Sequence, residues 1–400
     1  MWEQIRSNQR KSVVLVVLMG ALLVALGYFL GLYFLGSPTG GLIIALAIWV
    51  IMSLLAFFQG DSILLSISKA KKISRNDHPR LYNVVEEMKI ASGLEKMPDI
   101  YIIDDPALNA FATGRGPDRA AVCITSGLLQ KLNRDELQGV IGHEISHIKN
   151  RDVLLMSMLS VLLGTIVILA WYASRMLFFS GMARGRRSSS AGGGGAQLII
   201  LALGIVLMIL APIAAQFIYF AVSRKREYLA DASSALYTRY PEGLASALEK
   251  LATSSTPVRA ANKATAPMYI INPFQKKGMS VNSLTSTHPP IAERIHILRS
   301  MGTGSFADYD SAYRKVRMAK KGVMPASALA MEAVSIRSLQ PEAAEAEPDE
   351  VQRARETSEL LWQHSNYKTI NCQCGTKLRL PPHFKGSSIK CPHCGRINAV

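Results

Sequence analysis

The sequence has 400 residues and a formal net charge of +16 at pH 7. Hydrophobic residues make up 49% of it and charged residues only 18%, below the roughly 25% of ordinary soluble domains. Because the apolar residues lie in long runs, the composition excludes an ordinary soluble enzyme and indicates a membrane protein. Much of the basic surplus flanks these runs, and neither an aromatic platform nor a recognition helix is evident, so we expect no nucleic-acid partner.

The first 60 residues are predicted to form a transmembrane hairpin. Apolar runs over 12–35 and 41–58 are each long enough to cross a bilayer, and a turn at 37–40 joins them. Basic residues beyond both outer ends place those ends in the cytoplasm. A cleaved signal peptide is the alternative for the first run, but the run lacks a convincing cleavage site and a second span follows at once.

From residue 77 the composition becomes globular and predicts a small sheet. Pro79 opens a helix, 100–103 is a predicted strand, and 109–113 pairs with 120–125 as a hairpin. An edge strand can bind any extended peptide through backbone hydrogen bonds, whereas a purely structural hairpin is the alternative. The candidate substrate-binding residues are Asn109, Ala110, Phe111 and Ala112. The lone Cys123 is most simply a core residue.

The segment from His143 to His147 carries the most specific chemical pattern, His-Glu-Ile-Ser-His. Asn133 and Glu136 have the spacing of a capping pair, so both histidines lie inside a helix. Two histidines four residues apart share one helix face and can reach a single zinc ion. Glu144 is then placed to take a proton from the water on that zinc, as in other His-Glu-x-x-His metallohydrolases. An ordinary helix that happens to carry two histidines is the alternative.

The third metal ligand has to come from a distant part of the chain. The metzincin pattern needs a glycine and a third histidine where this sequence has Asn150 and Val153. Two further apolar runs follow, at 153–172 and 198–222. If both cross the membrane, the chain returns after residue 222 to the level of the histidines.

Glu227 is the predicted third zinc ligand because it follows directly on this return. It completes a two-histidine, one-glutamate set with the fourth position left for water. Asp231 lies on the same helix face and is predicted to hold His143 by its other ring nitrogen. A solvated acid pair at a helix start is the alternative. The basic residues at 184–187 would lie outside, against the charge rule, so partly buried hairpins are an alternative to clean spans.

His288 precedes two prolines that open another predicted helix, and Arg294 lies further along it. A side chain at such a helix start can point into a cleft. Spacing alone does not bring either residue to the metal, and a helix-capping histidine with a surface arginine is the alternative.

The C-terminal segment is predicted to hold a second metal. An acidic, proline-containing stretch at 339–351 is a predicted solvated linker. Two cysteine pairs follow with 16 residues between them, a spacing typical of a zinc ribbon whose four thiolates leave no open position. These structural zinc ligands are Cys372, Cys374, Cys391 and Cys394. Two disulfides are the alternative in an oxidising compartment.

The chain resembles the HtpX-type membrane zinc metalloproteases, which are kin of the CAAX prenyl proteases. The resemblance covers roughly residues 1–300 and rests on four motifs in this order: Asn109–Gly114, His143–His147, Arg226–Asp231, and Thr287–Pro290 with Arg294. It implies zinc on His143, His147 and Glu227, with Glu144 as the catalytic carboxylate. It also implies that His288 and Arg294 face the active site and stabilise the reacting carbonyl.

The resemblance further implies a protein quality-control endopeptidase in a bacterial or archaeal cell membrane, with its active site facing the cytoplasm. Membrane or misfolded proteins would be its substrates. The acidic linker and zinc ribbon depart from the usual short form, so the ribbon's partner is unknown. The alternatives are a prenyl-protein processing enzyme, and a membrane-anchored zinc-binding scaffold or sensor with a vestigial active site.

Together these patterns predict a mainly α membrane protein with four apolar helices, an α+β zincin-type catalytic domain and a small zinc-ribbon domain. The expected divisions are a hairpin over 1–60, the metalloprotease domain over 61–325, an acidic, Ala-rich linker and helix over 326–368, and the ribbon over 369–400. Two zinc ions are expected for each chain, one catalytic and one structural.

Overall fold

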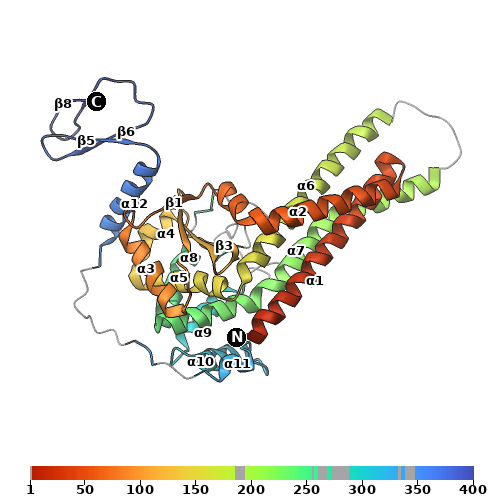
Figure 1. The fold of residues 1–400 in the computed structure, drawn as a ribbon, viewed down its shortest axis with the longest axis horizontal. Coiled ribbons are helices and arrows are strands. Elements are labelled where there is room, and N and C mark those ends of the chain that lie inside the picture. The colour runs from red at the N-terminus through yellow and green to blue at the C-terminus, as the bar shows by residue number, and fades with distance from the viewer. Residues whose placement is uncertain are drawn as a thin grey trace.

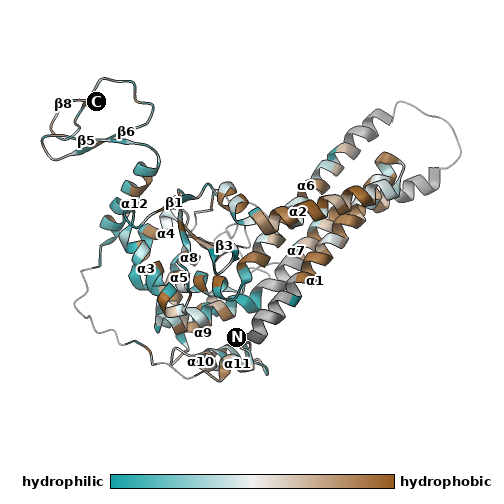
Figure 2. Cartoon of the chain, viewed as in Figure 1, coloured by the Kyte–Doolittle hydropathy of each residue, from teal (hydrophilic) through white to brown (hydrophobic). Residues whose placement is uncertain are grey.

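The computed structural model describes residues 2–184, 194–254, 256–259, 268–271, 288–331, 335–337 and 347–400. Four long helices pack together and project from one side of a mixed α/β body (Figure 1). They are α1 (Trp2–Leu30, continued by a π turn over Gly31–Leu35), α2 (Pro38–Ile67), α6 (Asp152–Arg184) and α7 (Gly194–Thr238). Their projecting surface is strongly hydrophobic along α1 and α2 (Figure 2).

Three of these helices are long and apolar enough to cross a membrane. They cover Val13–Leu35, Pro38–Ile67 and Asp152–Met176. Within the described part of α7, the apolar stretch is only Ala202–Phe217, which is shorter than a span. The first three predicted runs therefore form helices with the length and composition of membrane spans, whereas the described part of the predicted fourth run, 198–222, does not reach that length. The basic loop at 185–193 lies outside the described residues.

The α1–α2 hairpin is held by close backbone contact between small residues. The Ser37 hydroxyl caps α2 by accepting the Gly40 amide hydrogen bond at 3.1 Å. A Cβ on Gly41 would lie 2.2 Å from the Gly27 carbonyl oxygen, so only glycine permits this approach. The two helices consequently leave the body as one unit.

The body contains a four-stranded sheet with the order β1-β2-β4-β3. β2 and β4 are parallel, while the β1–β2 and β3–β4 pairs are antiparallel, and β3 lies at one edge. The strands are β1 (Lys71–Ile73), β2 (Asp99–Ile103), β3 (Ala110–Gly116) and β4 (Arg119–Thr125). The predicted strand and hairpin are thus present, and the short β1 is an addition to the prediction.

Helices cover the sheet and enclose one hydrophobic core. α5 is at its centre, and its start has the predicted capping box between Asn133 and Glu136. α8 approaches α5 so closely that a Cβ on Gly139 would lie 2.6 Å from the Leu244 nitrogen. The helices are α3 (Pro79–Ser92), α4 (Ser126–Lys131), α5 (Arg134–Lys149), α8 (Pro241–Thr253), α9 (Ile291–Arg299), α10 (Phe306–Arg317) and α11 (Ala326–Leu329).

The helix α12 (Glu350–His364) docks on the body. Its Leu360 is 1% exposed and belongs to the main core, and Arg353 donates a hydrogen bond to the Gln130 carbonyl at 3.1 Å. α12 lies within the segment 326–368, predicted as a linker and helix, and it packs on the body. Residues 339–346 of the predicted solvated stretch 339–351 lie outside the described residues. Two small hairpins follow, β5 (Lys368–Asn371) with β6 (Lys377–Leu380), and β7 (Ser388–Lys390) with β8 (Ile397–Ala399).

Candidate active site

Three predicted metal ligands converge in the body, at the base of the projecting helices. The Nε2 atoms of His143 and His147 on α5 lie 3.3 Å apart. Glu227 on α7 places its Oε2 atom 3.6 Å from the Nε2 of His143 and its Oε1 atom 3.6 Å from the Nε2 of His147. Ligands about 2.0–2.1 Å from a tetrahedral zinc are separated by about 3.4 Å, so the spacing fits this ion. The Oε2 atom of Glu227 is buried without a hydrogen-bond partner. A buried carboxylate oxygen without a hydrogen-bond partner is also expected in a site that binds a cation.

Glu227 reaches the histidines because α6 and α7 run out and back as an antiparallel pair. α6 begins at Asp152, three residues after α5 ends, and α7 carries the chain back to Glu227 without a break. The predicted return therefore occurs, even though the described apolar part of α7 is shorter than a span. Two ligands from one helix and a third from a remote helix make a site that forms only in the folded chain.

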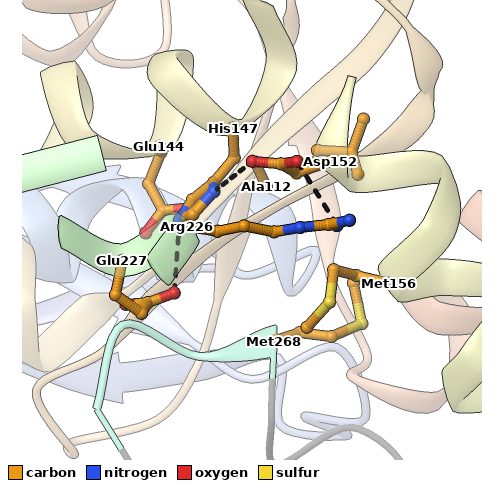
Figure 3. A pocket seen from close by; sticks show the side chains of 9 residues that line it. Ala112, Glu144, His147, Asp152, Met156, Arg226, Glu227 and Met268 are labelled. Carbon is orange, nitrogen blue, oxygen red and sulfur yellow. Dashed lines mark hydrogen bonds and ion pairs between the residues drawn. The ribbon is translucent and has the colours of Figure 1, made fainter. Parts of the chain in front are cut away.

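Glu144 lies beside this cluster and is 1% exposed. It lines a pocket together with His147 and Glu227 (Figure 3). Burial raises the pKa of its carboxyl, while the neighbouring histidines and a hydrogen bond from the Ala112 backbone oppose that rise. A carboxylate with a raised pKa is suited to accept and then release a proton.

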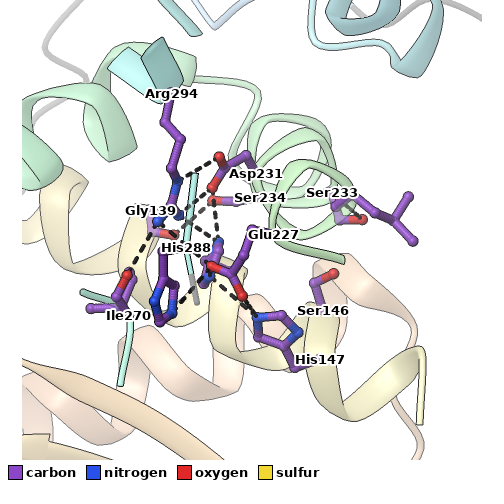
Figure 4. A network of polar contacts seen from close by, with 12 residues as sticks. Gly139, Ser146, His147, Glu227, Asp231, Ser233, Ser234, Ile270, His288 and Arg294 are labelled. Carbon is purple, nitrogen blue, oxygen red and sulfur yellow. Dashed lines mark hydrogen bonds and ion pairs between the residues drawn. The ribbon is translucent and has the colours of Figure 1, made fainter. Parts of the chain in front are cut away.

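A buried polar network lies behind His143, and Figure 4 shows its members Asp231 and Arg294. The Nδ1 of His143 lies 3.0 Å from Asp231, which leaves Nε2 to face His147 and Glu227. Burial opposes the charged form, yet the carboxylates of Asp231 and Glu227 beside it raise the pKa of His143 to about 9. The cluster therefore attracts positive charge at this position. The structure places Asp231 where the sequence predicted it, against His143.

Arg294 and His288 also reach the site. Arg294 is fully buried and contacts Asp231 through two nitrogens, while Nη1 donates to the Ile270 carbonyl at 3.1 Å and lies 3.6 Å from Glu227. His288 Nε2 lies 3.7 Å from Glu227. Burial is the main reason that the pKa of His288 falls to about 4, with Glu227 opposing it. The alternative prediction for these residues was a helix-capping histidine and a surface arginine. Both side chains are instead buried beside Glu227.

Comparisons with known proteins agree with this site. The profile of Peptidase family M48 matches residues 75–302. Proteins named "Protease HtpX homolog" are similar as well. That of Dictyoglomus turgidum is 45% identical over 302 residues, and that of Streptococcus agalactiae serotype III is 43% identical over 301 residues. The matches cover 75% of this chain and 95% and 100% of those proteins.

The chain belongs to peptidase family M48. It is therefore a metalloprotease, and its apolar helices make it a membrane metalloprotease. A crystal structure of S. mikatae Ste24p is similar over 74% of this chain and 67% of that one, with 21% identity and a TM-score of 0.40. Metalloproteases of family M48 use zinc, which agrees with the ligand spacing described above.

In this M48 member the four predicted edge-strand residues have different surroundings. Ala112 lines the pocket. Ala110 already accepts a hydrogen bond at 3.0 Å from Ile270, and the Asn109 side chain donates to the Ile271 carbonyl at 3.2 Å. Phe111 packs edge-on against Tyr269, with ring centroids 5.2 Å apart. The segment 268–271 therefore occupies part of the β3 edge, and Ala112 is the position nearest the catalytic groups.

Two residues at this site were not predicted from the sequence. Asp152 and Arg226 both line the pocket and form a buried ion pair, with 3.3 Å between Oδ1 and Nη1. Asp152 also lies 3.4 Å from the Nδ1 of His147. The sequence did offer a signal for Asp152, which is an acid five residues after His147 and directly before an apolar run.

The four C-terminal cysteines also form a cluster. Cys372 and Cys394 have their sulfur atoms 3.5 Å apart, and Cys374 and Cys391 have theirs 3.8 Å apart. These separations are too long for disulfides, whose sulfurs lie about 2.05 Å apart, and they suit four thiolates around zinc at about 2.3 Å. Cys123 lies fully buried in β4, as expected of a core residue.

Proposed function

We propose that this M48 metalloprotease is a zinc endopeptidase that cleaves membrane or misfolded proteins on the cytoplasmic side of a bacterial or archaeal cell membrane. The observation that carries the proposal is the convergence of His143, His147 and Glu227 beside the buried Glu144. Three protein ligands with a fourth position open is the composition of catalytic rather than structural zinc sites.

The chemistry divides among the side chains. Bound zinc supplies a water of lowered pKa and polarises the scissile carbonyl. Glu144 accepts a proton from the attacking water and passes it to the leaving amine, for which its burial and raised pKa are suited. Asp231 holds His143 with Nε2 directed to the metal position, and so fixes the ring's tautomer.

Of the two residues predicted to stabilise the reacting carbonyl, His288 has the better position. Its imidazole lies beside Glu227, and with a pKa near 4 it is neutral at pH 7 and able to donate a hydrogen bond from a ring N–H. Arg294 directs its nitrogens to Asp231 and to the Ile270 carbonyl. We therefore assign Arg294 to positioning Asp231.

The membrane position supports substrates that are themselves membrane proteins. The pocket wall includes Val153 and Met156, which belong to the first turns of the membrane helix α6. Basic residues follow α2 and flank the return of α7, as expected for the cytoplasmic side. A cleft at this level can receive cytoplasmic loops or extracted segments, which is the task of a quality-control protease.

Glu144→Gln tests the proposal, because glutamine keeps the shape of the side chain and loses its basicity. The purified variant should keep its zinc and its melting temperature while cleavage of an unfolded membrane protein falls by at least about 10³-fold. Glu86→Gln, a partly exposed site on α3, is the matched control and should cleave normally. Undiminished cleavage by Glu144→Gln would remove Glu144 from the mechanism.

A further inference from the structure

A buried carboxylate lies behind each of the two zinc-binding histidines. Asp231 lies behind His143, with 3.0 Å between Oδ1 and Nδ1. Asp152 lies behind His147, with 3.4 Å between Oδ2 and Nδ1. Both carboxylates are at most 1% exposed. The arrangement around His147 therefore parallels that around His143, although Asp152 comes from a membrane helix.

The two imidazoles need such partners for the same reason. His147 can give its Nε2 lone pair to a metal only if the ring proton is on Nδ1, and a carboxylate acceptor holds that proton there. The Asp152 Oδ2 atom lies 3.4 Å from this nitrogen. The contact therefore favours the tautomer of His147 with its proton on Nδ1, and it holds the ring in one orientation.

Arg226 holds the other end of the Asp152 side chain. Its Nη1 atom lies 3.3 Å from Oδ1, and its side chain is only 7% exposed (Figure 3). A buried carboxylate without a cation would be strongly disfavoured, so the guanidinium offsets the burial of Asp152 and holds its side chain in place. Arg226 directly precedes Glu227 in α7, so one helix supplies both the third ligand and the partner of Asp152.

We propose that Asp152 is a positioning residue for the metal ligand His147, and that Arg226 fixes Asp152 in that role. The start of α6 and the returning end of α7 are thereby linked to each other and to the metal centre. This inference rests on the proposed function, since it requires His147 to bind the metal.

A purely structural role is the competing explanation, because an acid in the first turn of a helix stabilises that helix. The experiment therefore measures metal affinity and the stability of the metal-free protein separately. Full-length wild type, Asp152→Asn and Asp152→Ala are purified in detergent and titrated with a zinc chelator. A Glu227→Ala reference shows how much zinc the cysteine cluster retains. Asp135→Asn is the matched control, because Asp135 lies in the first turn of α5 and its recorded ion pair is with Arg337.

We expect both Asp152 variants to lose about 10–100-fold in affinity for the Glu227-dependent zinc. Their metal-free melting temperatures should fall about as far as that of Arg226→Gln, because all three variants break the same buried ion pair. The visible spectrum of the Co²⁺-loaded site should change most in the Asp152 variants, which alone remove the carboxylate beside His147. Arg226→Gln should show a smaller loss, and Arg226→Lys, which keeps the cation, should recover part of it. Asp135→Asn should bind zinc normally.

Two results would overturn the inference. One is unchanged zinc affinity and an unchanged Co²⁺ spectrum in both Asp152 variants. The other is a loss of zinc affinity in the Asp152 variants no larger than that in Arg226→Gln, which breaks the same ion pair but keeps the carboxylate beside His147, and this would show a structural role. Failure of the proposed function would look different, because wild type itself would then hold no zinc that Glu227→Ala removes.

Discussion

Arg294 and Asp231 form a two-pronged ion pair inside the catalytic body, with Nη2 and Oδ1 2.6 Å apart and Nε and Oδ2 2.8 Å apart. Neither side chain is exposed. Asp231 in turn contacts His143, the proposed metal ligand. The pair thus joins α9 to α7 and, through the histidine, to α5.

Breaking this pair should destabilise the protein strongly. Arg294→Ala leaves the Asp231 carboxylate buried without its cation, which typically costs about 3–5 kcal/mol. Arg299→Ala is the control on the same helix. Its pair with Glu242 is about 40% exposed on both sides and should contribute below about 1 kcal/mol. Thermal unfolding of the two metal-free variants in detergent measures the difference, and equal stabilities would contradict the structural reading.

Zinc content should distinguish the four-cysteine site from the histidine–glutamate site. The wild-type chain should hold two zinc ions, because both ligand clusters have the spacing of a tetrahedral site. Glu227→Ala and Cys391→Ser should each hold one, and only the first should lose cleavage through loss of the catalytic metal. Elemental analysis of the purified proteins measures this. A single ion that is insensitive to Glu227→Ala would favour the zinc-binding scaffold over the enzyme.

His78 should make stability fall on acidification. Its Nδ1 caps α3 by accepting the Leu81 amide hydrogen bond at 3.2 Å, and burial, with Arg80 nearby, lowers its pKa to about 4. The unfolded chain titrates near 6.5. Between these values the unfolded state binds the extra proton, so stability is complete above about pH 6.5 and declines towards pH 4. The loss amounts to roughly 3 kcal/mol, at about 1.4 kcal/mol for each pKa unit.

Melting temperatures at pH 7.5 and 5 measure this effect. His78→Asn keeps a capping acceptor but cannot be protonated, so its melting temperature should change less between the two pH values. His296→Asn removes an exposed histidine and should behave as wild type. An identical pH dependence in all three proteins would exclude His78 as a contributor.

Met156 should influence which substrates are cleaved. With Val153 and Met268 it forms the apolar part of the pocket beside Glu144. Methionine adapts its shape to its neighbours, so a large apolar substrate residue next to the cleaved bond should fit there. Met156→Ala should lower kcat/KM about tenfold for a leucine peptide relative to an alanine peptide.

A series of fluorogenic peptides that differ only at that position measures the ratio. Met176→Ala is the control, since Met176 is 55% exposed further along the same helix. If Met156→Ala and Met176→Ala have the same selectivity, the pocket does not bind this substrate residue.

The sequence predicted the site best where the determinants are local. The capping box at Asn133, the face shared by His143 and His147, and the start of α3 at Pro79 all depend on residues within a few positions of one another. Glu227 was predictable in spite of its distance, because two consecutive apolar runs must bring the chain back to its starting level. The order of the apolar runs along the chain is enough to predict this return, without knowledge of side-chain positions.

The remaining features depend on tertiary packing that local patterns do not encode. Asp152 looked like the first residue of an apolar run, and its contacts with His147 and Arg226 exist only in the folded chain. A helix was predicted within 326–368, but the sequence did not indicate that α12 docks on the body, where Leu360 on one face enters the core. Arginine usually lies at the surface, yet Arg294 is among the largest fully buried side chains.

α7 is one continuous helix of 45 residues that contains both Ala202–Phe217 and the ligand Glu227. Pro212 lies in the apolar part of this helix, and between it and Glu227 the helix is unbroken, so a change of tilt there is passed along the helix. Bilayers of different acyl-chain length change the tilt of helices that they surround, at a modest energetic cost. We therefore expect catalytic efficiency to vary with the acyl chains of the vesicles in which the enzyme is reconstituted.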